Sequence, residues 1–283
     1  MTITEMHISL KLLVDKLDAS LTPNIDAEVI DVFLNKAQDR FVKQRMSGLN
    51  VHRTSFEENQ KRTDDLRALI TDTVLTPEDV SARNKPFGRF FTLPSTSGLE
   101  YWFTINEEAE VVYQDCNAVE VESGDLEVGI SYLVDGTITY NGTEYTSSST
   151  TLSYFTAVSG VLTFTGTGSV LKASSKRVEV KPLSHDNYNK AVKDPFNKSY
   201  HNQVRRLAYQ DQAELLGDET FAPSAYYLRY IKKPAAMSLD PASNCELSDH
   251  THDEIVDIAV SLLLEDIESG RYQTNLNELI KQE

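Results

Sequence analysis

Residues 130–170 read ISYLVDGTITYNGTEYTSSSTTLSYFTAVSGVLTFTGTGSV, and their pattern predicts how the middle of the chain folds. Short runs of aromatic and β-branched residues alternate with Thr and Ser, which is typical of strands with one wet face. Asp135-Gly136 and Asn141-Gly142 are dipeptides that favour tight hairpin turns. Short strands broken by such turns predict a small antiparallel sandwich or barrel.

Strand patterns continue on both sides of this stretch. Aromatic and β-branched residues gather at positions 90–93, 101–105, 111–113 and 226–232. Pro234 ends the last of these runs, because proline cannot donate to a strand ladder. The sequence therefore predicts a β domain that covers residues 88–234.

Both ends of the chain carry helical patterns. Apolar residues recur every three or four positions over about 6–19, 26–46 and 251–270, which predicts amphipathic helices. Thr251 and Glu254 have the spacing of a capping box, so Thr251 is the predicted N-cap of the last helix.

One more helix is predicted between these patterns and the β domain. Ser55 and Glu58 form a second capping box, and Leu66, Leu69 and Ile70 supply its apolar positions. This helix is expected to end near Thr73.

Helices at both ends with strands between them predict an α+β fold. The N- and C-terminal segments, residues 1–87 and 235–283, would form a helical bundle. Residues 88–234 would form an inserted antiparallel β-sandwich or barrel domain.

The charge balance limits the partners that the chain can have. It has 27 Lys and Arg against 43 Asp and Glu, a formal net charge of −16. Wrapping nucleic acid needs a basic surface, so this composition argues against it. The simplest interpretation of the negative charge is a solvated acidic surface. The charge is also compatible with a channel wall that DNA passes without binding.

The patterns that resemble catalytic or metal sites have simpler explanations. The run His250–Glu254 places two His on different sides of a helix start, with no third ligand apparent. Ser184–Asp186 is a set of chain neighbours, whereas catalytic triads are assembled in space. Cys116 and Cys245 form no CxxC pair or disulfide framework. We expect no catalytic residue, no metal and no cofactor.

Acidic pairs and glycines are interpreted in the same way. Glu107-Glu108 and Glu265-Asp266 are read as solvated charge in a turn and on a helix face. Gly166-Thr167-Gly168 lacks the lysine and third glycine of a phosphate loop. The N-terminus lacks a secretory signal and no run is long enough to span a bilayer, so we expect synthesis in a reducing cytoplasm and no membrane partner.

One segment has the opposite charge to the rest of the chain. Between about residues 172 and 233, Lys and Arg outnumber Asp and Glu. Aromatic residues are interleaved with the basic ones, which would suit nucleic acid or a neighbouring acidic subunit. Because the rest of the chain is acidic, we prefer contact between the basic segment of one subunit and the acidic surface of the next. Head-to-tail contacts of this kind generate rings. The predicted inter-subunit residues are Lys190, Lys193, Lys198, Arg205 and Arg206.

Four stretches carry a resemblance to a known family. They are VKPLSHDNYNKAVKDPFNKSYHNQVRRLAY at 180–209, YYLRYIKKPAAM at 226–237, DAEVIDVFLNKAQDRFVKQRM at 26–46, and HTHDEIVDIAVSLLLEDI at 250–267. They resemble the neck-ring and head-to-tail connector proteins of crAss-like tailed bacteriophages. The resemblance implies a virion structural protein, a homo-oligomer in a twelve-fold ring beneath the portal that bridges capsid and tail. It implies no catalytic residues.

This resemblance gives the acidic balance an expected role. Carboxylates would line a channel through which genomic DNA slides without specific binding. The candidates are Asp257, Glu265, Asp266 and Glu268.

Two alternatives belong to other classes of protein. The β domain could bind a host receptor or glycan at the tail tip, through the aromatic residues Tyr140, Tyr145, Tyr154 and Phe155, although cross-strand packing would explain them as well. A virion-borne cell-wall hydrolase would need a paired acid and nucleophile or a metal site, and the sequence assembles neither.

Overall fold

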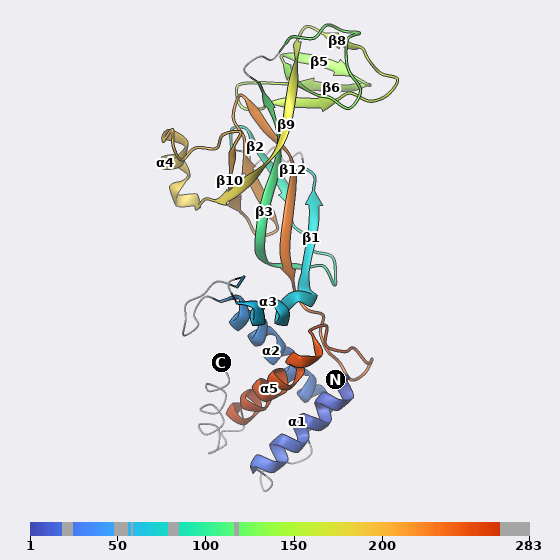
Figure 1. The fold of residues 1–283 in the computed structure, drawn as a ribbon, viewed down its shortest axis with the longest axis vertical. Helices are drawn as coiled ribbons and strands as arrows, with labels where there is room; N and C mark the ends of the chain where they lie inside the picture. Colours follow the sequence, from blue (N-terminus) through green and yellow to red (C-terminus); the bar gives the residue numbers. More distant parts are fainter. Residues whose placement is uncertain (19–24, 48–55, 58, 79–84, 116–118, 267–283) are drawn as a thin grey trace. The chain divides into compact units, whose positions relative to one another are not determined.

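The computed structural model describes residues 1–18, 25–47, 56–57, 59–78, 85–115 and 119–266 (Figure 1). The chain forms two compact units. We call Met1–Thr71, Thr96–Phe103 and Ile231–Glu283 the helical unit, and Asp72–Ser95 and Thr104–Tyr230 the β unit. The predicted α+β class with a β domain is confirmed. The predicted domain limits of 1–87 with 235–283 and 88–234 stay a prediction.

Helices from both ends of the sequence pack together in the helical unit. They are α1 (Ile3–Asp18), α2 (Ala27–Met46), α3 (Gln60–Leu66) and α5 (His252–Asp266). Apolar positions three and four apart turn one stripe of each long helix inward, and both α1 and α2 contact α5. The fully buried side chains include Met6, Leu10, Leu34, Ala37, Ile255 and Ala259. None of the described helices is long and apolar enough to cross a membrane.

Buried charges add to this apolar packing. Arg45 of α2 donates to Asp65 of α3 at 2.8 Å, and it also contacts Glu254 of α5. His250 lies 2.9 Å from the other oxygen of Asp65. The guanidinium of Arg45 thus joins α2 to α3 and α5, because its several N–H donors can bind two carboxylates at once.

The predicted helix from Ser55 to Thr73 is wrong at its C-terminal end. Helix α3 stops at Leu66, a 3-10 turn follows, and Ile70 already begins strand β1 (Ile70–Leu75). The sequence ITDTVL is rich in β-branched residues, and its pairing with β12 in the sheet outweighs the helical spacing. The N-cap of α3 is Asn59, whose side chain accepts from the Lys61 amide. Ser55 and Glu58 lie outside the described residues.

Thr251 is not the N-cap that the sequence predicts. It lies in the 3-10 turn Asp249–Thr251, and its hydroxyl donates to the Ser248 carbonyl at 2.8 Å. Helix α5 begins at the next residue. Glu254 turns outward to Lys61 and Arg45 instead of closing a capping box.

The larger sheet is strongly curled and mixed. Its main path runs in the order β1-β12-β3-β9-β10-β11-β2. The bounds are β2 (Gly88–Thr92), β3 (Tyr101–Gln114), β9 (Ser169–Pro182), β10 (Gln203–Ala208), β11 (Gln212–Leu216) and β12 (Phe221–Lys232). Strand β10 runs parallel to β9, whereas β3 and β9 run antiparallel. A parallel neighbour cannot follow a tight turn, so the chain must cross over between β9 and β10.

Residues 126–170 form a substructure of the β unit that we call the tip (Figure 1). It contains β4 (Ser131–Asp135), β5 (Thr137–Tyr140), β6 (Thr143–Thr146), β7 (Ser153–Thr156) and β8 (Phe164–Gly166). Strand β4 pairs with β7 and β9, while β6, β5 and β8 make a separate three-stranded sheet. Asn141 and Gly142 both have positive φ, which confirms the predicted tight hairpin.

The tip has a hydrophobic core of its own. Tyr132, Ile138, Tyr140, Phe155 and Val170 are buried in it. The Phe155 ring stacks on Tyr140 at a centroid distance of 4.3 Å and on Tyr132 at 5.6 Å. Aromatic pairs of this geometry stabilise a small core beyond the area they bury.

Candidate subunit interface

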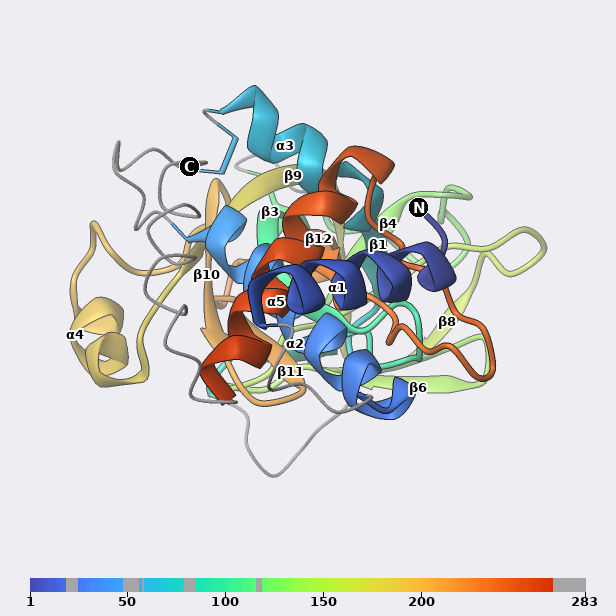
Figure 2. The same cartoon turned by 90° about the horizontal axis from the view of Figure 1, so that it is seen from below.

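The crossover between β9 and β10, residues 183–202, carries most of the predicted contact residues, and we call it the arm. It includes the short helix α4 (Tyr188–Lys193). Figures 1 and 2, which are turned by 90°, both show α4 standing clear of the strands of the β unit. The arm is therefore a projection from the sheet, produced by the parallel pairing of its two flanking strands.

A compact turn follows α4 and fixes the arm's end. One carboxylate oxygen of Asp194 accepts from the Phe196 amide at 3.0 Å, and the other accepts from the Asn197 side chain at 2.5 Å. The Lys198 amide donates to the Asp194 carbonyl at 3.0 Å. Because these donors favour the charged carboxylate, with the Phe196 amide first, the pKa of Asp194 lies below its ordinary value.

This turn holds an aromatic ring in solvent. Phe196 is 86% exposed, and Val192 and Tyr200 on the same arm are also exposed. Single exposed apolar residues are ordinary, but a phenyl ring this exposed in a hydrogen-bonded turn makes the arm a candidate contact surface.

Four of the five predicted basic residues gather at the arm. Lys190 and Lys193 lie exposed on α4, and the side chain of neither has a hydrogen-bond or ion-pair partner among the described residues. Lys198 is 3.1 Å from Asp218. Arg205 donates to the Asn197 carbonyl at 3.0 Å, which ties the first residues of β10 to the arm's turn.

Arg206 has a different environment from the other four. Its Nε lies 2.8 Å from Glu107 Oε2 as an ion pair without hydrogen-bond alignment, and the Tyr226 hydroxyl donates to the same carboxylate at 2.9 Å. The side chains are only 13% and 9% exposed. Arg206 therefore stabilises the interior of the β unit and has little surface left for a neighbouring subunit.

The prediction that Glu107 is a solvated turn residue is wrong. Glu107 lies inside the long strand β3 and is buried. Burial raises the pKa of its carboxyl, with Arg206 and Tyr226 opposing that effect. Sequence patterns missed this pair because its members are distant in the chain and meet only through the pairing of strands.

The acidic residues predicted for a DNA channel lie along α5. Glu265 and Asp266 are exposed, and Asp257 is half-buried. Glu268 lies outside the described residues.

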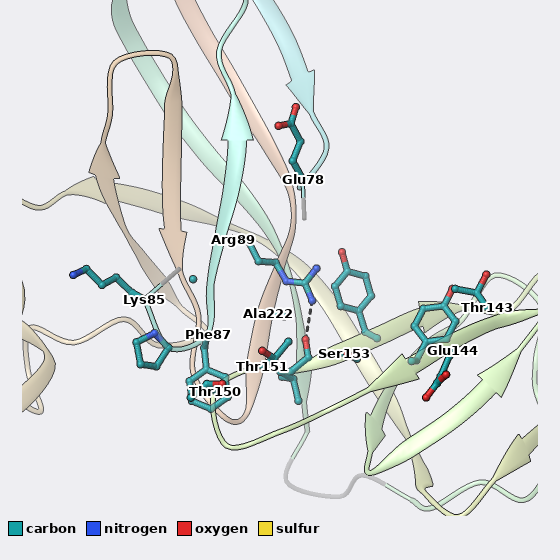
Figure 3. A pocket seen from close by; sticks show the side chains of 15 residues that line it. Glu78, Lys85, Phe87, Arg89, Thr143, Glu144, Thr150, Thr151, Ser153 and Ala222 are labelled. Atoms are coloured by element: carbon teal, nitrogen blue, oxygen red, sulfur yellow. Dashed lines mark hydrogen bonds between the residues drawn. The ribbon is translucent and has the colours of Figure 1, made fainter. Parts of the chain in front are cut away.

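A cavity of about 590 Å³ opens between β2 and the tip in the β unit (Figure 3). Arg89 crosses it, donating to the Leu152 carbonyl at 2.7 Å and stacking on Tyr154 with its guanidinium 4.6 Å from the ring centre. Figure 3 shows Glu78 and Glu144 well apart on different sides of Arg89. Carboxylates placed in this way do not form an acid–base pair across one substrate.

The aromatic residues considered for glycan binding mostly pack inward. Tyr140 and Phe155 are buried in the tip, and Tyr145 lies against the Phe155 ring at 5.6 Å. Tyr145 and Tyr154 line the cavity of Figure 3 and remain half-buried. Cross-strand packing is thus the main role of this set.

The metal-like and triad-like runs do not assemble sites in the part of the chain that the structure describes. His250 points to Asp65, while His252 Nε2 lies 3.0 Å from the Leu247 carbonyl. His185 Nε2 lies 2.7 Å from the Ala208 carbonyl, not beside Ser184. Across the described residues there is no group of three His, Cys, Asp or Glu side chains that could hold a metal ion.

Comparison with known proteins assigns the chain to a family. The family model described as phage tail ring protein 3/4 matches residues 1–126 and 166–275. The match therefore includes the arm and all the described helices, and it leaves out residues 276–283 and residues 127–165, which make up most of the tip. No curated protein matches the chain. The chain belongs to the phage tail ring protein 3/4 family and is a structural protein of the phage virion.

Proposed function

We propose that this protein forms a homo-oligomeric ring in the head-to-tail connector of the phage, where it bridges the portal and the tail. Family membership over most of the chain is the observation that carries this proposal. A twelve-fold ring would match the symmetry that the resemblance to neck proteins implies. The neighbours in the stack would be the portal and other ring proteins.

The arm supports the homo-oligomeric part of this proposal. Ring subunits that contact each other head to tail need two different complementary surfaces on every copy. Lys190, Lys193 and Lys198 outnumber Asp186 and Asp194 on the arm, and Arg205 lies just beyond it on β10, within a chain of net charge −16. Opposite charges steer such an encounter and fix its register.

The acidic residues of α5 support passage of DNA through the ring. Glu265 and Asp266 expose their carboxylates, and a lumen that carries them would repel phosphates and leave the genome free to slide. Asp257 and Glu268 belong to the same proposed lining.

A reconstruction of the phage neck by electron cryomicroscopy tests this function. The expected map contains a closed ring of this chain between portal and tail, with Glu265 and Asp266 on its inner wall. A ring whose α5 faces outward would refute the lumen lining, and a chain located only at the distal end of the tail would refute the connector position.

The second candidate function is binding of a host glycan by the tip. The cavity in Figure 3, with Tyr145, Tyr154 and Arg89 in its wall, is the observation that favours it. A glycan array probed with the full chain, and with Tyr145→Ala as the matched variant, separates the two functions. Binding that this substitution abolishes would support the candidate.

A further inference from the structure

The β unit has an acidic surface whose charge is opposite to that of the lysines on the arm. Residues 119–128, between β3 and β4, expose Glu120, Glu122, Asp125 and Glu127, and we call this segment the acidic patch. Val119 is 66% exposed and Val128 57% exposed at its two ends. The patch is thus both acidic and apolar, as the arm is both basic and apolar.

The backbone of the acidic patch is fixed to the tip. The Val121 amide donates to the Val170 carbonyl at 2.8 Å, the Gly124 amide to the Leu162 carbonyl at 3.0 Å, and the Lys172 amide to the Val119 carbonyl at 3.1 Å. Among its acidic side chains, Glu127 is 2.7 Å from Lys172. A surface whose backbone is already ordered loses little entropy when a partner docks.

The arm is ordered in the same way. Asp194 accepts from the Phe196 amide, and Arg205 donates to the carbonyl of Asn197, so the backbone that carries Phe196 is ordered before any contact forms. Aromatic side chains that fill apolar sites in this manner are the residues that dominate binding energy in interfaces.

We propose that the arm of one subunit docks on the acidic patch of the next copy of this chain, with Phe196 between Val119 and Val128 and with Lys190 and Lys193 against Glu120 and Glu122. Charge complementarity selects this occupant. An acidic polynucleotide would match the arm but be repelled by the patch, whereas a second copy satisfies both surfaces.

The inference rests on the proposed ring and names the surfaces that close it. Because the arm and the acidic patch are different parts of the β unit, their contact is heterologous, and a pair of joined copies still has one free arm and one free patch. Such contacts propagate until the ring closes.

Charge reversal in the full chain tests the pairing. Lys190→Glu with Lys193→Glu is expected to reduce incorporation of the protein into particles at least tenfold, and Glu120→Lys with Glu122→Lys should do the same. The chain that carries all four substitutions is expected to recover most of the incorporation. Failure of this chain to recover, with each pair harmful alone, would overturn the proposed pairing.

Zero-length carbodiimide crosslinking of purified particles tests the contact directly. The expected products are multimers of this chain, in which Lys190 or Lys193 is joined to Glu120, Glu122 or Asp125. Lys181 is the internal control, because it lies 3.6 Å from Glu179 of the same chain and should react within the monomer band.

The outcomes separate the inference from the proposed function. Multimers joined through other residues would overturn the docking of arm on patch and leave the ring in place. Lys190 joined to a different virion protein would assign the arm to that partner instead. Absence of this chain from the particles would remove the proposed function itself.

Discussion

The arm and the tip both extend from the same sheet, but the tip buries its aromatic residues and the arm exposes one. The tip buries Tyr132, Tyr140 and Phe155 in a core of its own. The arm leaves Phe196 86% exposed at the end of a fixed turn. A segment that buries its apolar side chains is stable by itself, whereas a segment that is ordered and still exposes them is prepared for a partner.

The family match also separates the arm from the tip. Its two matched segments include the arm and leave out residues 127–165, so the tip is where this chain departs from the pattern of the family. The arm and residues 119–126 of the acidic patch lie within the match, whereas Glu127 and Val128 lie outside it.

The largest effect is expected from Phe155→Ala. Removing a buried ring that stacks on Tyr132 and Tyr140 leaves a cavity, and it should lower the free energy of unfolding by about 3–5 kcal/mol. Urea unfolding of the full chain measures it. A loss below about 1 kcal/mol would show that the tip has no independent core.

Arg206→Met is expected to cost nearly as much, because it leaves the Glu107 carboxylate buried without its cation. The expected loss is about 3 kcal/mol in urea unfolding. Adding Glu107→Leu should recover most of it, since burial of the charge is then no longer needed. Lys193→Met, at an exposed basic residue of the arm, is the control and should change stability by less than about 0.5 kcal/mol. Equal losses from the two single variants would contradict the separation of Arg206 from the arm.

Phe196→Ser should impair assembly and leave stability nearly unchanged, unlike Phe155→Ala. The free energy of unfolding is expected to change by less than about 0.5 kcal/mol, because the ring has few contacts within the chain. Incorporation into particles should fall about tenfold or more, as for the loss of an interface anchor. Val158→Ser, at an exposed position of the tip, is the matched control. Normal incorporation of Phe196→Ser into particles would contradict the role of Phe196 as an interface anchor.

The smallest effect is expected from Asp194→Ala, which loosens the turn without removing the ring. Incorporation should fall by less than for Phe196→Ser, while urea unfolding stays unchanged. The lowered pKa of Asp194 gives a second readout. Its carboxylate holds the turn at neutral pH, and this contribution is lost as pH falls through the lowered pKa, below the ordinary value of 3.8. A turn that loosens between pH 5 and 7 would contradict the role of this carboxylate.

Local patterns in the sequence predicted the parts of the fold that depend on local spacing. Helices α1, α2 and α5 follow from apolar residues at helical spacing, and the Asn141-Gly142 hairpin follows from its turn chemistry. Strand β1 was mistaken for helix, because its partner β12 lies about 150 residues away and pairing overrode the local pattern.

The candidate site was predictable only in part. The basic character of residues 190–205 is visible in the sequence, but the parallel pairing that makes the arm project is not. The burial of Arg206 depends on Glu107, which lies far away in the chain on β3, on the other side of β9 from β10. The acidic patch was missed, although alternating Val and Glu from Val119 to Glu122 was a signal that could have found it.

Copy number in purified particles, measured by quantitative mass spectrometry against the portal subunit, shows whether this chain forms a connector ring. We expect a ratio near one, as for two rings of the same symmetry stacked on one axis. A ratio of half or less would contradict the connector ring and favour a position at the tail tip, and absence of the chain from particles would contradict its place in the neck altogether.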